Sequence, residues 1–114
     1  MRLIRTANNA QGKAIVVEDR DAGRMLDIEA PRANEGGRWL VVPFAPGQST
    51  GWHAVHCLVY VTVVAGQLEF ALDGGETLTV RAGDCIIEGD NTLHSWTNSG
   101  ETVAIVSAFE LDLP

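Results

Sequence analysis

Hydrophobic and polar residues alternate in short runs along most of the chain, which is the pattern of half-buried β-strands. Gly, Pro, Asn and Asp separate the runs at intervals of eight to twelve residues, a spacing typical of a sandwich or barrel. The one weak candidate for a helix lies near residues 21–29. The pattern predicts an all-β domain, with strands at 14–17, 38–44, 53–64, 67–72, 77–81, 85–87 and 102–111.

Composition and charge narrow the classes of partner. The 114 residues suffice for one domain, and 46% hydrophobic against 20% charged residues excludes a disordered chain. The net charge is −7, and Lys13 is the single lysine among eight scattered bases. We therefore expect no nucleic-acid partner. An anionic substrate would gain no long-range steering, although Arg38 or Arg81 could hold one locally.

The number of cysteines and the hydropathy of the chain predict where in the cell the protein is located. Two cysteines, Cys57 and Cys85, are too few for a disulfide framework, and residues 1–9 lack the apolar core of a secretory signal. The longest apolar stretch, residues 57–65, is far shorter than the ~20 residues of a membrane span. The sequence therefore predicts a cytoplasmic protein with free thiols and no membrane partner.

Two spacings of Gly, His and Asn carry more information than composition does. The first joins Gly47, His53, Val55, Val59 and Gly66, and the second joins Gly83, Gly89, Asn91, His94 and Asn98. On these residues the chain resembles the cupin superfamily, whose two motifs read G-x5-H-x-H-x3-E-x6-G and G-x5-P-x-G-x2-H-x3-N. Similar phrases flank both motifs, so that the resemblance covers about residues 38–111.

The resemblance implies a fold and an assembly. We expect a single cupin domain over residues 1–114, with a small jelly-roll-like β-barrel at about 38–111 and an N-terminal arm of strand and loop at 1–37. Cupins are often dimeric and carry their site inside the barrel, so a homodimer is expected, with a contact on the outward row His56, Leu58 and Tyr60. Residues 18–37 are read either as a strand exchanged in the dimer or as a lid.

The resemblance also implies a divalent metal, held in the family by three His and one Glu. In this chain His53 and His94 match, whereas Val55 and Val59 replace the second His and the Glu. His56 is a doubtful third ligand, because on a regular strand it faces away from His53. One Zn, Fe, Mn or Ni ion is thus a possible cofactor. The alternative is that both matching histidines are neutral, hydrogen-bonded barrel residues.

A pocket beside the two histidines is the other candidate site. Residues of suitable position and apolar character are Trp52, Val55, Cys57, Val59 and Trp96. Core filling is the alternative interpretation of the aromatic residues, and small buried hydrophobes are the usual role of free cysteines. Such a pocket would be apolar and would hold two imidazoles able to give or take protons near neutral pH.

These observations favour an enzyme that acts on a small molecule inside the barrel. The expected chemistry is acid–base, of the lyase, isomerase, cyclase or decarboxylase type, with His53 and His94 as the catalytic residues. A metal would assist only if a third ligand existed, and dioxygenase chemistry is less favoured because it needs a full set of ligands. The alternative is a non-catalytic small-molecule binding or sensing cupin that has lost its metal site.

Overall fold

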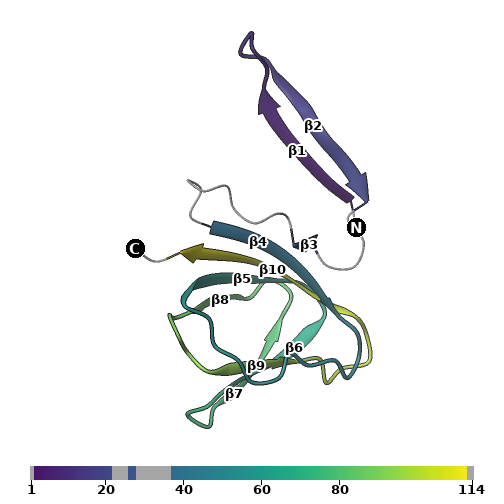
Figure 1. Cartoon of the computed structure of the whole chain (residues 1–114). Coiled ribbons are helices and arrows are strands. Elements are labelled where there is room, and N and C mark those ends of the chain that lie inside the picture. Colours follow the sequence, from purple (N-terminus) through teal and green to yellow (C-terminus); the bar gives the residue numbers. More distant parts are fainter. Residues whose placement is uncertain (1, 22–25, 28–36, 113–114) are drawn as a thin grey trace.

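The computed structural model describes residues 2–21, 26–27 and 37–112, and it confirms an all-β architecture (Figure 1). In chain order its strands are β1 (Arg2–Asn8), β2 (Ala14–Asp21), β3 (Leu26–Asp27), β4 (Gly37–Phe44), β5 (Cys57–Ala65), β6 (Gln67–Leu72), β7 (Thr77–Arg81), β8 (Cys85–Glu88), β9 (His94–Thr97) and β10 (Ala104–Asp112). Each of the seven predicted strands overlaps a strand of the structure, and three more, β1, β3 and β9, were not predicted.

The strands from β3 to β10 form two sheets that enclose one core. The larger sheet has the order β3-β4-β10-β5-β8 and the smaller one β7-β6-β9, with antiparallel neighbours throughout. Together they make the small barrel seen below the N-terminal hairpin in Figure 1. The buried apolar side chains between them are Phe44, Cys57, Val59, Val61, Val63, Leu68, Phe70, Val80, Trp96, Ala104, Val106 and Ala108.

Strand β5 shows how alternation places side chains inside the barrel. Every second residue from Cys57 to Val63 is buried, while Tyr60, Thr62 and Val64 are exposed. The predicted strand began at residue 53, and that start is wrong by four residues. The chain before Cys57 pairs with β9 rather than continuing the line of β5.

The N-terminal residues form a hairpin of their own. Strands β1 and β2 pair with each other as a separate two-stranded sheet, which projects from the barrel in Figure 1. The sequence had predicted only a strand at residues 14–17. The weak helix candidate at 21–29 is wrong where the structure describes it, since Asp21 ends β2 and Leu26–Asp27 is β3. Most of the segment proposed as a lid or exchanged strand lies outside the described residues.

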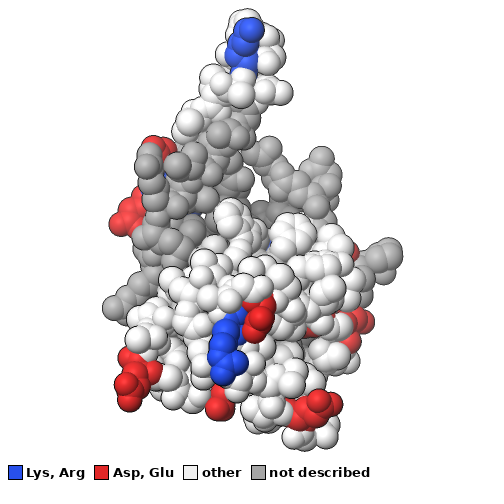
Figure 2. All heavy atoms as spheres, turned by 180° about the vertical axis from the view of Figure 1, so that it is seen from behind, with Lys and Arg blue, Asp and Glu red and all other residues white. Residues whose placement is uncertain are grey.

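The surface of the molecule agrees with the charge balance of the sequence. On the face shown in Figure 2, the basic side chains are few and separate, and no continuous basic patch forms among the described residues there. In the part of the chain that the structure describes, no helix is long and apolar enough to cross a membrane.

Gly66 is the position where the turn between β5 and β6 requires glycine. Its φ is +74°, and a Cβ there would lie 2.8 Å from both the Ala104 Cα and the Val103 carbonyl oxygen. Both the left-handed backbone and the contact with β10 therefore oppose a side chain. Gly83 has a φ of +94° but open space where a Cβ would stand, which makes it a matched control.

We predict that Gly66→Ala lowers the free energy of unfolding by about 3 kcal/mol, combining left-handed strain and overpacking. Gly83→Ala should lower it by only about 1 to 2 kcal/mol, the strain alone. Urea unfolding with unchanged m values measures both changes. Equal losses in the two variants would contradict the role assigned to the Ala104 contact.

Candidate functional site

The residues that open the first motif pair with strand β9, which carries the end of the second. The Gly47 amide donates to the Asn98 carbonyl at 2.7 Å. Further along, His53 and His94 exchange both backbone hydrogen bonds, at 2.9 and 3.0 Å. The pairing brings two histidines that are far apart in the sequence to the same place in the barrel.

Asn98 fixes one end of this pairing through its side chain, which is fully buried. Its Nδ2 donates to the carbonyls of Phe44 at 2.9 Å and Thr102 at 2.8 Å, and its Oδ1 accepts from the Gly100 amide at 3.0 Å. A buried amide costs free energy unless it is hydrogen-bonded, and these three bonds involve both ends of the group. Asn98 therefore has a structural role, joining β4 to the turn before β10.

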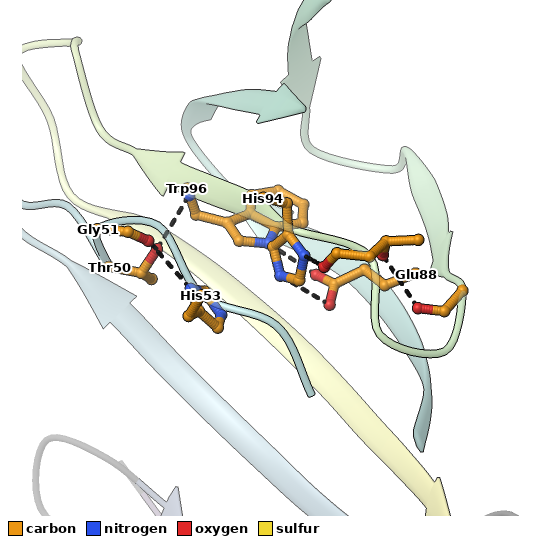
Figure 3. A network of polar contacts seen from close by, with 8 residues as sticks. Thr50, Gly51, His53, Glu88, His94 and Trp96 are labelled. Atoms are coloured by element: carbon orange, nitrogen blue, oxygen red, sulfur yellow. Dashed lines mark hydrogen bonds and ion pairs between the residues drawn. The ribbon is translucent and has the colours of Figure 1, made fainter. Parts of the chain in front are cut away.

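The rings of His53 and His94 touch edge to face, with centroids 4.4 Å apart and planes at 63° (Figure 3). The Nδ1 of His53 lies 3.0 Å from the Gly51 carbonyl, and the Nδ1 of His94 lies 2.8 Å from the Thr92 carbonyl. Because a carbonyl oxygen can only accept, each Nδ1 carries the proton of its bond. In the neutral form of either ring, Nε2 is then the basic nitrogen.

Glu88 adds a buried carboxylate beside His94. Its Oε1 accepts a 2.7 Å hydrogen bond from the Trp96 indole, and its Oε2 lies 3.0 Å from the His94 Nε2 (Figure 3). That short contact is not aligned as a hydrogen bond, and among the described residues the His94 Nε2 is the one buried side-chain N or O atom left without such a partner. The contact is an ion pair whenever the His94 ring carries a proton on both nitrogens.

Glu88 was not among the site residues predicted from the sequence. Its place in the site depends on the register between two strands, which the sequence pattern of one strand does not show. Glu88 is directly opposite Val59 across β5 and β8, and cross-strand partners point to the same face of a sheet. Val59 stands where the cupin motif has its carboxylate. The structure therefore places an acid on β8, one strand away from the position of the carboxylate in the cupin motif.

A cavity of about 110 Å³ opens beside this network inside the barrel. Three of the five residues expected to form a pocket, Val55, Val59 and Trp96, line it. Trp52 is 57% exposed, and neither it nor the buried Cys57 is part of the lining. The full lining is Leu40, Val42, Phe44, Thr50, His53, Val55, Val59, Val61, Glu88, Trp96, Val106, Ala108 and Glu110.

The two histidines differ in whether they line this cavity. His53 lines it directly, whereas His94 is 1% exposed and does not. His94 instead contacts two residues of the lining, His53 through its ring and Glu88 through Nε2. His94 can therefore act on a bound molecule only through these neighbours.

Neither the doubtful third ligand His56 nor the nearby pocket candidate Cys57 completes a metal site with the two histidines. The His56 side chain is 82% exposed, and its Nδ1 lies 4.0 Å from an oxygen of Asp90 at the surface. Burial raises the pKa of the Cys57 thiol, and the charges of Glu110, Asp112 and Glu88 raise it further, against a lowering by Arg38. A thiol ligates metals as the thiolate, so both effects disfavour Cys57 as a ligand.

The donor set does not fit the family's metal. The His94 Nδ1 is engaged by a backbone carbonyl and its Nε2 faces Glu88, while Val55 and Val59 place methyl groups where the motif has ligands. Among the residues that the structure describes, no three His, Cys, Asp or Glu side chains converge as metal ligands do. We therefore derive no step through a metal.

Comparisons with known proteins agree with this architecture. The family model described as "Cupin domain" matches residues 40–110. A cupin 2 conserved barrel domain protein from Salinispora arenicola superposes with a TM-score of 0.69 at 23% identity, covering 78% of this chain and 75% of that one. The Cupin_2 domain of an XRE family transcriptional regulator from Enterobacter cloacae gives 0.68 at 18% identity, covering 79% and 95%.

A curated relative is the cupin-domain-containing oxidoreductase srdB of Neurospora crassa. It is 33% identical over 61 residues, which are 54% of this chain and 31% of the relative. The match thus spans about a third of that longer protein.

We predict that the protein, purified without chelator or a metal-binding tag, contains well below one equivalent of metal, because the donors do not converge. Elemental analysis measures the content of the wild type and of His53→Ala, His94→Ala and Glu88→Gln. About one equivalent in the wild type, lost in all three variants, would contradict the prediction. It would mean that a change of rotamer assembles a two-His, one-carboxylate centre.

Proposed function

The chain belongs to the cupin family, and from that membership we propose that it is an enzyme acting by acid–base chemistry on a small molecule in the barrel cavity. One observation carries the proposal: a buried carboxylate–imidazole pair lies beside a cavity that a second imidazole also lines. Buried ionisable groups cost free energy to fold, and they are concentrated where enzymes transfer protons.

The geometry supports separate roles for the three groups. His53 lines the cavity, and its Nδ1 bond to Gly51 leaves Nε2 to accept a proton from a bound molecule. Glu88, also in the lining, delivers a proton from the pair that it forms with His94. His94 is thus a positioning residue. In an isomerisation one proton goes to His53 and another comes from Glu88, so the protons balance within a turnover.

Oxidoreduction is the second candidate, and the name of the Neurospora crassa relative supports it. That relative is about three times as long as the matched segment, so its activity does not transfer directly. The elemental analysis described above tests whether a redox metal is present. The non-catalytic binding or sensing module stays a third outcome, because a cupin barrel hosts many unrelated functions.

We predict that the wild type accelerates exchange of the α-protons of small ketones in D2O, followed by ¹H NMR on cyclopentanone and 4-methylpentan-2-one. His53→Ala and Glu88→Gln should each lower the rate by roughly 10²–10⁴-fold, the usual contribution of a positioned acid or base. His56→Ala is the matched control, since this exposed histidine should leave the rate unchanged.

Exchange at the rate of buffer alone, with ligand binding intact, would contradict an acid–base enzyme and favour the binding module. A rate that falls equally in His56→Ala would show that the exchange does not arise in the cavity. Circular dichroism of each variant confirms that the barrel is folded.

We also propose that the protein is a homodimer that uses the outer face of the larger sheet. Trp39, Phe109, Tyr60 and Ile87 are cross-strand neighbours in a single row over β4, β10, β5 and β8. Each side chain is exposed, between 42% and 66%. A continuous apolar row on a surface is typical of an interface between proteins. The row runs across the strands, whereas the expected contact at His56, Leu58 and Tyr60 ran along one of them.

We predict that Phe109→Glu at the centre of the row converts the dimer into a monomer, because a desolvated charge would face the partner's apolar side chains. Leu78→Glu, an exposed leucine on β7 in the other sheet, should leave the dimer intact. Sedimentation velocity measures both. A monomeric wild type, or a dimer that survives Phe109→Glu, would disprove this interface.

A further inference from the structure

Each carboxylate of the cavity lining already has an ion-pair or hydrogen-bond partner within the protein. Two carboxylates, Glu88 and Glu110, belong to the lining. Glu88 lies against the His94 ring, with its Oε2 3.0 Å from Nε2, and its Oε1 accepts a hydrogen bond from the Trp96 indole. A molecule in the cavity therefore meets a carboxylate whose two oxygens both already contact a nitrogen, and not an isolated negative charge.

Glu110 is compensated in the same way by Arg38. The Arg38 Nε and Nη2 lie 3.1 and 2.9 Å from the Glu110 Oε2, and the glutamate side chain is only 18% exposed. Hydrogen bonds between charged partners are shorter and stronger than neutral ones, and a partly buried pair is weakly screened by salt. The arginine that the sequence offered as a local anion site is thus engaged by an acid of the cavity wall. Arg81 is exposed on β7 and is not part of the lining.

The rest of the lining is apolar, apart from two groups that can hydrogen-bond without a fixed charge. These are the Thr50 hydroxyl and the His53 imidazole, which lie in the segment that pairs with β9. Aliphatic and aromatic side chains make up the other walls. The volume of about 110 Å³ is smaller than the roughly 150 Å³ of an engineered apolar cavity that holds benzene, so only a ligand of few heavy atoms fits.

From this arrangement we infer that the cavity takes a small, uncharged, mainly apolar molecule with one hydroxyl group, and discriminates against carboxylates, phosphates and ammonium ions. A charged ligand would lose its hydration and find only partners that are already paired. A neutral hydroxyl needs just one or two hydrogen bonds. It can donate to the His53 Nε2 or to the Thr50 oxygen, whose own proton is donated to the Gly51 carbonyl at 2.9 Å. The inference rests on the proposed function, since it names the substrate class of the same site.

Three probes of nearly equal size test the inference: 3-methylbutan-1-ol, 3-methylbutan-1-amine and 3-methylbutanoate. Each is titrated at pH 7.5, and binding is followed by the indole N–H resonance of Trp96, assigned with Trp96→Phe. We expect the alcohol to bind with a Kd on the order of millimolar, as its few heavy atoms allow, and at least roughly tenfold more tightly than either ion.

The outcomes separate this inference from the proposed function. Equal or tighter binding of the carboxylate or the amine would overturn the neutral substrate class but leave a ligand-binding cavity in place. No response to any of the three probes would overturn both. Tighter binding of the alcohol than of both ions is the supporting result.

A variant tests the electrostatic cause directly. Glu110→Gln removes the negative charge that a residue of the lining sets against Arg38, so the affinity for 3-methylbutanoate should rise by roughly tenfold while that for the alcohol changes little. Glu76→Gln removes the same charge in the exposed turn between β6 and β7, outside the lining, and should change neither affinity. An unchanged carboxylate affinity in Glu110→Gln would overturn the role given to the Arg38–Glu110 pair.

Discussion

The pairing of the segment from Gly47 to His53 with strand β9 is the constraint on which the site depends. Backbone hydrogen bonds at both ends set its register, and the buried Asn98 amide holds the end nearer the next turn. Once this register is set, His53 and His94 must meet, because each occupies one side of the same bridge. The contact between the two imidazoles thus follows from a backbone interaction that involves no catalytic chemistry, while the register of β5 and β8 brings Glu88 to the same cavity.

Burial of the polar network costs free energy of folding, and the contacts within the network offset part of that cost. Glu88 and His94 are 6% and 1% exposed, so both have lost most of their water. Their contact, together with the hydrogen bonds to Trp96 and to the Thr92 carbonyl, offsets that loss. A well-packed apolar pair at these positions would often be as stable. The presence of a buried ionisable network here therefore agrees with a role in function.

The changes at the two cupin motifs have a common consequence for chemistry. Val55 and Val59 make the cavity wall apolar where other cupins carry ligands, and an acid appears across the sheet at Glu88. Glu110, the partner of Val59 on the other neighbouring strand, β10, is paired with Arg38. Under the proposed function, this small chamber offers an uncharged molecule a proton donor at Glu88 and a proton acceptor at His53.

The sequence by itself determined seven of the ten described strands, the family and the two histidines, because alternation, turn residues and motif spacing are local properties of the chain. It indicated which face of β5 is buried, since parity along one strand is also local. Tertiary structure alone decided where β5 begins, that Glu88 is opposite Val59, and that Trp52 is outside the cavity. It also decided that Arg38 is paired with Glu110. Each of these depends on register between strands distant in sequence, which the local pattern of one strand does not encode.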